Sequence, residues 1–351
     1  MITIKCRSCF GNSKEIYKSK PIPEYIWPKK SFLSIKSNCQ IFSCLDCYHL
    51  QLQIFSKKKI KSFYGKENFV IEDNQKHKSR IKKIKSFYGK NFFKNKKILE
   101  IGGGVNPLII NNKNYDIIDF FISKKVKKIF KNNSYKKDID KFKIKKRYDI
   151  IILFHTLEHL LSPGKVISGL NNCLNKNGII LVEVPNFDFF IKNRPHYAVF
   201  HQHLSMFNIT NLNNLMSRFK LKSDIIFEKK EVLFCAFKKK ENYIYKLKKT
   251  DNNKRINLLK NNILKLGNSL KKFIKNKKFD IYGAGGTATL LLHNYSFLKK
   301  LVLNIYDNDK KKINKFLPLI KNKIQRTEKI NFKNRSLSFY NLKKNNNFFI
   351  K

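Results

Sequence analysis

The sequence has few acidic residues and few arginines. Its 351 residues include 75 Lys and Arg against 24 Asp and Glu, which gives a formal net charge of +51 at pH 7, yet only eight of the basic residues are arginine. Recognition of bases and phosphates usually relies on the forked guanidinium of arginine, so this charge does not predict a nucleic-acid partner. Lysine, asparagine, isoleucine and phenylalanine are all frequent throughout the chain, and biased codon usage explains this excess. Whatever its origin, the positive charge favours anionic ligands.

Long hydrophobic runs are also missing from the sequence. No apolar stretch approaches the about 20 residues that a membrane helix needs, and the first residues, Met-Ile-Thr-Ile-Lys-Cys, have no signal-peptide core. We therefore expect a cytoplasmic protein with no membrane partner. Seven cysteines in such a chain indicate metal ligation or packing rather than disulfides.

Two Cys-x-x-Cys pairs lie within the first 55 residues. Cys6 and Cys9 form the first pair, and Cys44 and Cys47 form the second. Each pair can place two thiolates on one tight turn, and together they supply the tetrahedral sulfur set that zinc prefers. We expect a structural zinc, because a segment with few large aliphatic residues needs such a staple. A vestigial site and a redox dithiol are the alternatives.

An apolar run that stops on three glycines marks a central domain. The run Ile98–Ile101 precedes Gly102, Gly103 and Gly104, the pattern of a buried parallel strand that ends in a tight turn. Glycine permits positive φ there and lets a ligand lie against bare backbone. Glu100, at the end of the strand, is a candidate for holding a cofactor. A purely structural turn is the alternative.

Alternating strand and helix patterns run from about residue 96 to 240, which predicts a doubly wound sheet. A second strand, Tyr115–Asp119, ends in an acid roughly 20 residues past the glycines, where Asp119 is positioned to take the ribose hydroxyls of a cofactor. Capping of a turn is the other interpretation of Asp119. The continuous apolar run Tyr148–Phe154 is typical of a central parallel strand.

A histidine-containing segment follows that central strand. His155-Thr-Leu-Glu-His159 is formally H-x-x-E-H, the signature of an inverted zinc protease. The preceding strand and the loop residues Ser162-Pro-Gly164 leave room for a short turn and not for a long catalytic helix. We therefore reject the protease interpretation.

Three histidines crowd into the fourteen residues 194–207, together with Arg194 and several aromatic residues. Histidine is the side chain suited to proton transfer near neutral pH. So many in one loop are hard to ascribe to core packing. His203 is our candidate base, and His201 or Arg194 is a candidate for stabilising an oxyanion.

A second strand–glycine turn lies after a helical, lysine-rich segment, residues 243–277. The sequence Phe279-Asp-Ile-Tyr282 leads into Gly283-Ala-Gly285, and a later strand ends at Asp307. This turn is a candidate for holding the pyrophosphate of a sugar nucleotide on backbone N–H groups. By spacing it is also a dinucleotide fingerprint for NAD(P), and a structural turn is the third interpretation.

Taken together, these motifs resemble class I S-adenosylmethionine-dependent methyltransferases, and most closely the nucleotide-sugar C-methyltransferases. The first motif, Glu-x-Gly-x-Gly, begins at Glu100, although Asn106 stands where a third glycine is frequent. Residues 155–159 resemble the family's Leu-Glu-His segment after the fourth strand. Within residues 194–207, the stretch that begins at Phe200 resembles its Tyr-His-Glu-His-Leu-Ser-Tyr-Phe-Ser segment.

The resemblance implies roles for further residues. It implies that Asp138 lies beside the adenine of the cofactor and that His155 faces the cofactor. The tyrosine, glutamate and second histidine implicated in the family's catalysis match Phe200, Gln202 and His203. Two of the three positions have lost their ionisable group, so the family's chemistry does not carry over whole. Phe200 and Gln202 still mark the substrate and catalytic region.

The resemblance also implies the architecture: an α/β protein with a Rossmann-like methyltransferase sheet. The expected parts are a zinc-binding domain at 1–55, a helical linker at 56–95, a methyltransferase domain at 96–240 and a C-terminal Rossmann-like domain at 241–351. Tyr282, Gly283, Gly285 and Asp307 would then bind the sugar nucleotide.

The expected function is methyl transfer from S-adenosylmethionine to a nucleotide-activated keto-sugar by C-methylation. A sugar O-methyltransferase, an RNA methyltransferase that uses the cysteine pairs and lysines for phosphate contacts, and a non-catalytic sugar-nucleotide-binding protein are the alternatives. Neither the sugar nor the oligomeric state follows from the sequence.

Overall fold

The structure is a computed structural model, and it describes residues 3–23, 36–37, 39–53, 74–109, 112–141, 143–329 and 336–338. Residues 56–73 of the expected linker lie outside these. The chain forms two compact units. The first comprises residues 1–15, 42–186 and 202–250, and the second comprises residues 16–41, 187–201 and 251–351.

None of the helices in the described part of the chain is both long enough and apolar enough to span a membrane.

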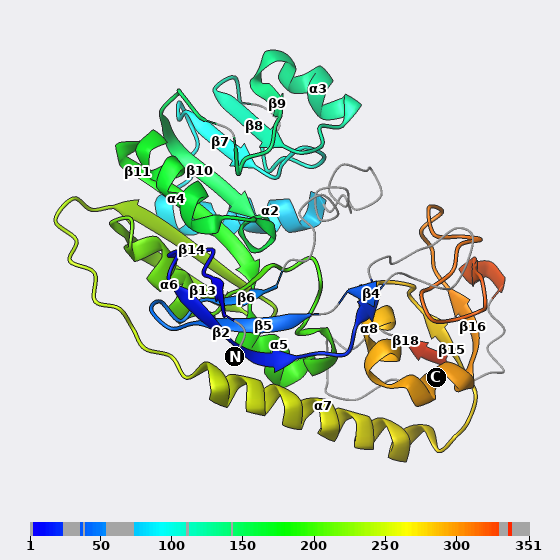
Figure 1. The fold of residues 1–351 in the computed structure, drawn as a ribbon. Helices are drawn as coiled ribbons and strands as arrows, with labels where there is room; N and C mark the ends of the chain where they lie inside the picture. Colours follow the sequence, from blue (N-terminus) through cyan, green and yellow to red (C-terminus); the bar gives the residue numbers. More distant parts are fainter. Residues whose placement is uncertain are drawn as a thin grey trace. The chain divides into compact units, whose positions relative to one another are not determined.

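A seven-stranded sheet forms the centre of the first unit (Figure 1), with the strand order β13-β14-β11-β10-β7-β8-β9. The strands from β9 to β11 are parallel, whereas β14 runs antiparallel to both of its neighbours. The chain therefore starts in the middle of the sheet, builds outward to β9, then crosses to β10 on the other side. The strands are β7 (Ile98–Ile101), β8 (Tyr115–Asp119), β9 (Ser134–Lys136), β10 (Tyr148–Phe154), β11 (Leu174–Pro185), β13 (Leu221–Lys229) and β14 (Val232–Lys239).

Helices cover both faces of this sheet because its central strands are apolar on both sides. Leu99 and Ile151 point to the face that packs against α4 and α6, and Ile98 and Ile150 point to the face that packs against α2 and α3. Each fully buried aliphatic side chain of this kind contributes roughly 1.5–3 kcal/mol. The expected doubly wound fold is confirmed. The helices and 3-10 turns are α2 (Asn74–Tyr88), α3 (Lys124–Phe130), η2 (Lys131–Asn133), η3 (Leu157–His159), α4 (Pro163–Cys173) and α6 (Ile209–Ser217).

A smaller five-stranded sheet contains the cysteine pairs, with the order β1-β2-β5-β6-β12. Its last strand comes from the histidine-rich segment, because β12 pairs antiparallel with β6 through Ser205 opposite Gln51. The segment that follows His203 is thereby fixed to the cysteine-containing part of the chain. The strands are β1 (Thr3–Lys5), β2 (Asn12–Lys18), β5 (Gln40–Cys44), β6 (Leu50–Leu52) and β12 (Ser205–Met206), and β3 (Ile22–Pro23) pairs separately with β4 (Lys36–Ser37).

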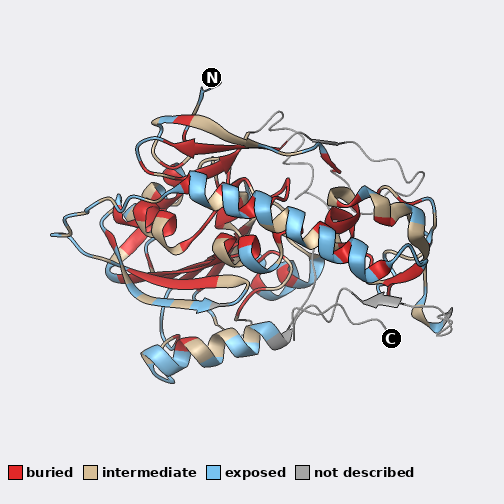
Figure 2. Ribbon diagram, turned by 90° about the horizontal axis from the view of Figure 1, so that it is seen from below, coloured by how far each residue is buried: buried red, intermediate tan, exposed pale blue. Residues whose placement is uncertain are grey.

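The second unit contains a four-stranded parallel sheet, β17-β16-β15-β18, with α8 between β15 and β16. Its long helix α7 begins nine residues later than expected, because Asp251 caps it by accepting the N–H of Lys254. The helix has buried residues at intervals and exposed residues between them (Figure 2). The elements are α5 (Phe187–Asn193), η4 (Pro195–Tyr197), α7 (Asn252–Ile274), β15 (Phe279–Tyr282), α8 (Gly286–Asn294), η5 (Ser296–Leu301), β16 (Val302–Tyr306), β17 (Ile324–Gln325), η6 (Thr327–Lys329) and β18 (Ser336–Ser338).

Candidate active site

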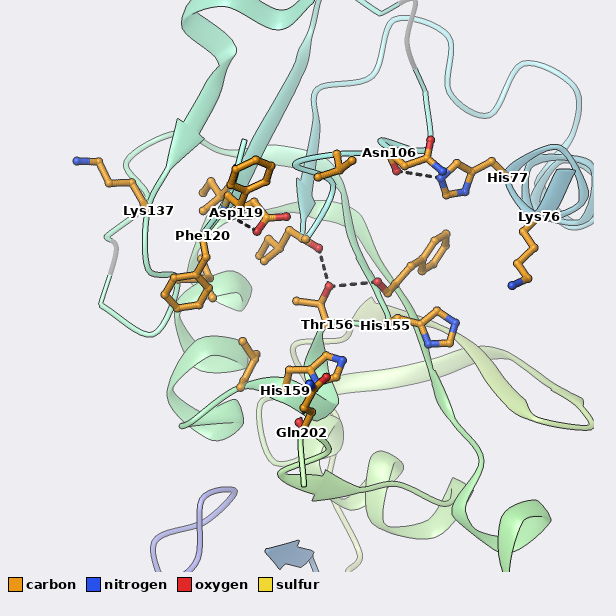
Figure 3. Close-up of a pocket in the computed structure, with 18 of the residues that line it drawn as sticks. Lys76, His77, Asn106, Asp119, Phe120, Lys137, His155, Thr156, His159 and Gln202 are labelled. Atoms are coloured by element: carbon orange, nitrogen blue, oxygen red, sulfur yellow. Dashed lines mark hydrogen bonds between the residues drawn. The ribbon is translucent and has the colours of Figure 1, made fainter. Parts of the chain in front are cut away.

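A cavity of about 390 Å³ opens at the carboxyl ends of β7, β8 and β10 (Figure 3). In a doubly wound sheet, ligands bind at this edge, where the strand order reverses. Here the reversal lies between β7 and β10. The cavity is lined by Lys76, His77, Arg80, Ile101, Gly102, Val105, Asn106, Ile118, Asp119, Phe120, Phe121, Lys137, Ile139, Phe154, His155, Thr156, His159, Leu160 and Gln202.

The glycine turn is shaped for close packing. Gly102 has φ +90°, which L side chains rarely adopt, and its N–H donates to the carbonyl oxygen of Ile118 at 3.0 Å. A Cβ at this position would lie 2.1 Å from Oγ1 of Thr156, a hydroxyl that donates to the carbonyl oxygen of Ile101 at 2.9 Å. Any larger residue would therefore push into the cavity wall. Gly103 and Gly104 belong to the same turn and lie outside the lining.

Asp119 lines the cavity and also braces the glycine turn. Its carboxylate accepts the N–H of Gly104 at 2.9 Å and the N–H of Phe121 at 3.1 Å. Burial raises the pKa of Asp119, although these N–H donors oppose the shift. Each carboxylate oxygen has further lone pairs, so bracing the turn and binding a ribose are compatible roles for this residue.

Two acids predicted to bind the cofactor, Glu100 and Asp138, are not among the residues that line the cavity. Glu100 is buried under the turn, where one oxygen accepts the N–H of Leu108 at 3.0 Å and the hydroxyl of Tyr115 at 2.6 Å. Burial raises the pKa of Glu100 to about 7. Asp138 accepts the N–H of Asp140, and the cavity is lined by the residues on either side of Asp138.

His155 faces the cavity between two carboxylates. Its Nε2 lies 3.0 Å from Oε1 of Glu183, and its Nδ1 lies 3.5 Å from Oε1 of Glu158. Burial lowers the pKa of His155, but the two carboxylates outweigh this and raise it to about 9. The residue has φ +49°, and its N–H donates to the carbonyl oxygen of Glu183 at 2.8 Å. Arg80, from α2, forms a salt bridge with the same oxygen of Glu183, Oε1.

An imidazole pair lies next to this network. The rings of His159 and His203 have centroids 5.2 Å apart, and both histidines lie with Glu158 in a cluster whose ligand atoms are within 4.8 Å of one another. Nδ1 of His159 donates to the carbonyl oxygen of Gln202 at 2.8 Å, since a carbonyl can only accept. His159 and Gln202 line the cavity. His203 is not among the lining residues, but its ring packs against His159, which is one of them.

Glu158 is 1% exposed, and its environment keeps it charged. Burial raises its pKa, but the neighbouring His159, His155 and His203 outweigh this, so that the pKa of Glu158 is lowered. A charged carboxylate can stabilise a positive charge that forms on a neighbouring imidazole. The cluster therefore combines a buried negative charge with candidate bases at the edge of the cavity.

Other predicted residues belong to the second unit. Arg194 precedes the 3-10 turn η4, and Phe200 and His201 are both buried, with ring centroids 4.7 Å apart. None of the three is among the residues that line the cavity.

The second glycine turn repeats the construction of the first. Gly283 has φ +97°, and its N–H donates to the carbonyl oxygen of Tyr306 at 2.8 Å. The carboxylate of Asp307 accepts the N–H of Ala284 at 2.8 Å and pairs with Lys312 at 2.8 Å. Gly285 caps α8 without a side chain, which leaves the first N–H groups of this helix accessible. The hydroxyl of Tyr282 accepts from Asn308 at 3.0 Å.

The four predicted zinc ligands come together. Sγ of Cys6 lies 3.6 Å from Sγ of Cys47, and Sγ of Cys9 lies 3.4 Å from Sγ of Cys44. A tetrahedral zinc with bonds of about 2.3 Å requires sulfurs about 3.8 Å apart, close to these distances. Cys39 lies outside this cluster.

The two cysteine turns have the same geometry. The N–H of Cys6 donates to the oxygen of Gly11, and the N–H of Cys44 donates to the oxygen of His49, each five residues on. The residue after each second cysteine, Phe10 and Tyr48, has positive φ. The backbone N–H groups of Ser8, Asp46 and Cys47 point at cysteine sulfurs. Such donors stabilise thiolates, so the cluster is compatible with a metal ion.

Several residues of the site were not predicted. Arg80 and His77 reach the cavity from α2, and Nε2 of His77 hydrogen-bonds to the carbonyl oxygen of Asn106 at 2.9 Å. They stand in a lysine-rich segment whose pattern indicates only an amphipathic helix. Glu183 lies within an otherwise apolar strand. Its acidic side chain in such a strand is the sequence feature that could have marked it as a functional residue.

Comparisons with known proteins agree with this geometry. Residues 74–223 match a protein family described as a methyltransferase domain. A comparison with curated proteins gives no match.

Several solved methyltransferases resemble the chain distantly. The N-methyltransferase NodS from Bradyrhizobium japonicum is 14% identical, with a TM-score of 0.35 over 49% of this chain and 100% of its own. An S-adenosylmethionine-dependent methyltransferase from Clostridium acetobutylicum is 12% identical, with a TM-score of 0.37 over 52% of this chain and 98% of its own. The plantazolicin methyltransferase BpumL, solved in complex with SAH, is 17% identical. Its TM-score is 0.37, over 52% of this chain and 90% of its own.

The family match and the site concern the same part of the chain. The parallel strands β7 to β11, the reversal of strand order beside the glycine turn and the cavity at that point all lie within the matched residues. The chain is therefore an enzyme with a methyltransferase domain that includes residues 74–223.

Proposed function

We propose that the enzyme methylates a carbon atom beside the ketone of a nucleotide-linked sugar. The observation that carries the proposal is the imidazole pair, His159 and His203, packed with the buried carboxylate of Glu158 beside the cavity. Methylation at carbon requires a base that removes a proton from the carbon next to the carbonyl group. An imidazole supported by a carboxylate can act as that base near neutral pH.

The cavity suits S-adenosylmethionine, and different residues would contact different parts of this cofactor. Gly102 offers bare backbone, Asp119 offers a carboxylate for the ribose, and Phe120 and Ile139 offer apolar surface for the adenine. Asp138 remains our candidate for an adenine contact, because its neighbours Lys137 and Ile139 line the cavity. When bound, the cofactor supplies an electrophilic methyl group on a sulfonium.

In this proposal, His203 accepts the proton from the sugar carbon. The bond to hydrogen breaks, its electron pair moves toward the carbonyl oxygen, and the proton binds to an imidazole nitrogen. Glu158 stabilises the imidazolium that forms, and His159 packs against it. Gln202 occupies the position of the glutamate in the family that the sequence resembles. Glu158 therefore provides a carboxylate that this position lacks.

The loss of that glutamate favours one alternative, transfer to a sugar hydroxyl. An O-methyltransferase needs a single base and no enolate. Gln202 retains hydrogen bonding but cannot take up or release a proton. The same cavity and the same base would serve this reaction.

The nucleotide part of the substrate is assigned to the second glycine turn. Gly283 and Gly285 expose backbone, and the first turn of α8 supplies N–H groups and the positive end of the helix dipole. Tyr282 and Asp307 flank this turn. The surplus of lysine in the chain favours such an anionic ligand.

We also propose that Cys6, Cys9, Cys44 and Cys47 bind a structural zinc. Four sulfurs at near-tetrahedral spacing, held by two turns of the same geometry, support this assignment. The metal would hold β1, β5 and β6 together and contribute no step of the reaction.

Two measurements test the proposal. Incubation with S-adenosylmethionine and a panel of nucleotide-linked keto-sugars should yield a product heavier by one CH₂ group in mass spectrometry. Without the methyl donor, in D₂O, the enzyme should incorporate deuterium at the carbon beside the ketone, and His203→Ala should abolish this exchange. Methylated product without deuterium exchange would establish the O-methyltransferase alternative. A protein that binds S-adenosylmethionine and methylates no sugar of the panel would overturn the sugar assignment.

A further inference from the structure

Three side chains that can bind a metal ion lie together beside the active-site cavity. Glu158 and His159 belong to the 3-10 turn η3, and His203 lies two residues before β12, which contacts this turn. Each of the three offers one ligand atom, and these atoms lie within 4.8 Å of one another. All three residues belong to the first unit of the chain.

The carboxylate of this cluster is buried without hydrogen bonds. Glu158 is 1% exposed, and neither of its oxygens has a hydrogen-bond partner among the described residues. Nδ1 of His155 lies 3.5 Å from Oε1 of Glu158, and Nε2 of His159 lies 3.6 Å from the same oxygen. These distances are long for charge-assisted hydrogen bonds. Burying a charge is costly unless a partner contacts it directly, and a cation bound to the carboxylate would be such a partner.

The hydrogen bond of His159 leaves a ring nitrogen suited to a metal ion. His159 lies next to Gln202 (Figure 3), and its Nδ1 donates to the carbonyl oxygen of Gln202 at 2.8 Å. In the neutral ring the proton is therefore on Nδ1, and the lone pair is on Nε2. Nε2 is the nitrogen that faces Glu158. Histidines that bind metals usually donate their other N–H to a carbonyl or carboxylate oxygen in this way.

The donor set and its spacing fit a transition-metal ion. Two imidazoles and one carboxylate bind zinc in catalytic sites, with bonds of about 2.0–2.2 Å. Two such donors on a tetrahedral ion lie about 3.4 Å apart. Nε2 of His159 and Oε1 of Glu158 are 3.6 Å apart, close to this value. Magnesium prefers oxygen ligands and keeps several waters, so the two imidazoles select against it.

This set differs from the zinc-protease signature in the same segment. That signature uses both histidines of H-x-x-E-H, whereas here His203, from a distant segment, joins Glu158 and His159. Nε2 of His155 lies 3.0 Å from Oε1 of Glu183 instead. The spacing of residues along the sequence therefore does not indicate this cluster.

We propose that Glu158, His159 and His203 form an inhibitory site for a divalent transition-metal ion such as Zn²⁺. A carboxylate oxygen, Nε2 of His159 and a ring nitrogen of His203 bind the ion, and a fourth position is left to water. The ion takes up the lone pair with which His203 would accept the proton of the substrate. Inhibition therefore rests on the proposed function of His203, whereas binding of the ion does not.

Variants of the full chain locate the ion. In calorimetry and elemental analysis, the parent should bind one Zn²⁺ more than Glu158→Gln or His203→Ala at the same free concentration. Glu228→Gln, on β13, and His77→Gln, a cavity histidine outside the cluster, are the matched controls and should bind as many ions as the parent. Circular dichroism shows that each variant is folded. Equal ion counts in the parent, Glu158→Gln and His203→Ala would overturn the site.

Two other ions test the chemistry of the site in the parent protein. Co²⁺ at this cluster should absorb without the thiolate charge-transfer band that cysteine ligands give, so the cluster and the four cysteines are distinguished by spectrum. Mg²⁺ should bind at least a hundredfold more weakly than Zn²⁺. A Co²⁺ titration that gives only the thiolate band, or equal affinity for Mg²⁺, would overturn the assignment.

Turnover tests the inhibitory role. It should fall at least tenfold as the cluster fills with Zn²⁺, and it should return when free Zn²⁺ is buffered below the Kd that calorimetry gives. Binding at the cluster with unchanged turnover would overturn inhibition and would count against His203 as the base. The binding measurements need no methyl acceptor, so they stand even if the enzyme methylates no nucleotide-linked sugar.

Discussion

The guanidinium of Arg7 donates to the carbonyl oxygen of Leu204 at 2.6 Å, and also to the carbonyl oxygen of Leu52. Arg7 stands between the two cysteines of the first Cys-x-x-Cys pair, and Leu204 directly follows His203. Burial lowers the pKa of Arg7 to about 9, so that it remains charged at neutral pH. The cysteine cluster is thus connected by one side chain to the backbone that carries the proposed base.

Arg7→Lys should lower turnover about tenfold and leave the affinity for S-adenosylmethionine unchanged. A lysine keeps the charge but lacks the fork that reaches two carbonyl oxygens at once, so the His203 segment loses its position by a fraction of an ångström. Steady-state kinetics and calorimetry on the same preparation give the two quantities. Arg147→Lys, at an exposed position, is the control. Unchanged turnover in Arg7→Lys would show that the hydrogen bond from Arg7 to Leu204 does not position His203.

Metal analysis of the purified protein should give about one zinc per chain. Cys44→Ser should lose it and should lower both the melting temperature and the turnover, because β5, β6 and β12 share one sheet. Cys235→Ser, a buried cysteine of β14 outside the cluster, should keep its zinc. A metal-free parent protein of normal stability would leave the cluster as a set of packed thiols.

The sequence was most informative where one local pattern carries the signal. The strand that stops on Gly102, the acid at Asp119 and the two cysteine pairs could be predicted because turn geometry and metal spacing are local properties. The structure confirms the doubly wound sheet and brings the four cysteines together.

What the sequence did not indicate depends on contacts between distant segments. Arg80 and Glu183 are 103 positions apart, and Arg7 and Leu204 are 197 apart. Long-range pairs of this kind leave no periodicity. Glu100 was expected at the cofactor, but its burial beneath the turn depends on Tyr115, which fills the space next to it in the adjacent strand.

Gly102→Ala should weaken S-adenosylmethionine binding at least tenfold. The backbone at φ +90° strains any alanine, and the added Cβ would also lie 2.1 Å from Oγ1 of Thr156 in the cavity wall. Gly89→Ala is the matched control, because Gly89 has the same φ but no atom within 4 Å of its Cβ. Both variants should lose similar backbone stability, about 1–2 kcal/mol. Equal affinity for the cofactor in the two variants would exclude the turn from its binding.

The pKa of His155 predicts how stability depends on pH. This pKa is about 9 in the folded state and about 6.5 in the unfolded chain. The folded state therefore binds the proton more tightly, and this contribution is complete below about pH 6.5 and is lost as the pH rises through 9. Thermal melts should show a decline in melting temperature over this window that His155→Gln reduces.

His49→Gln is the control for that measurement. Burial lowers the pKa of His49 to about 3, with Arg7 contributing, so this histidine stays neutral from pH 6 to 9. The unfolded histidine, with a pKa of about 6.5, is also largely neutral above about pH 7.5, so its replacement should change the melting temperature by a nearly constant amount from about pH 7.5 to 9. If His155→Gln also gave a constant offset, the proposed pairing of His155 with Glu158 and Glu183 would be wrong.

The last prediction concerns the proposed base. His203→Ala should lower turnover by about 10²- to 10⁴-fold, the usual contribution of general base catalysis, with cofactor affinity intact. Glu158→Gln should have a smaller effect. Without the buried carboxylate, the imidazolium that forms on His203 loses the charge that stabilises it, so the maximum rate should fall while the affinity for S-adenosylmethionine is kept. Glu228→Gln, which removes a carboxylate from β13 instead, should leave the maximum rate unchanged. Parent-like turnover in Glu158→Gln would mean that Glu158 does not support the base.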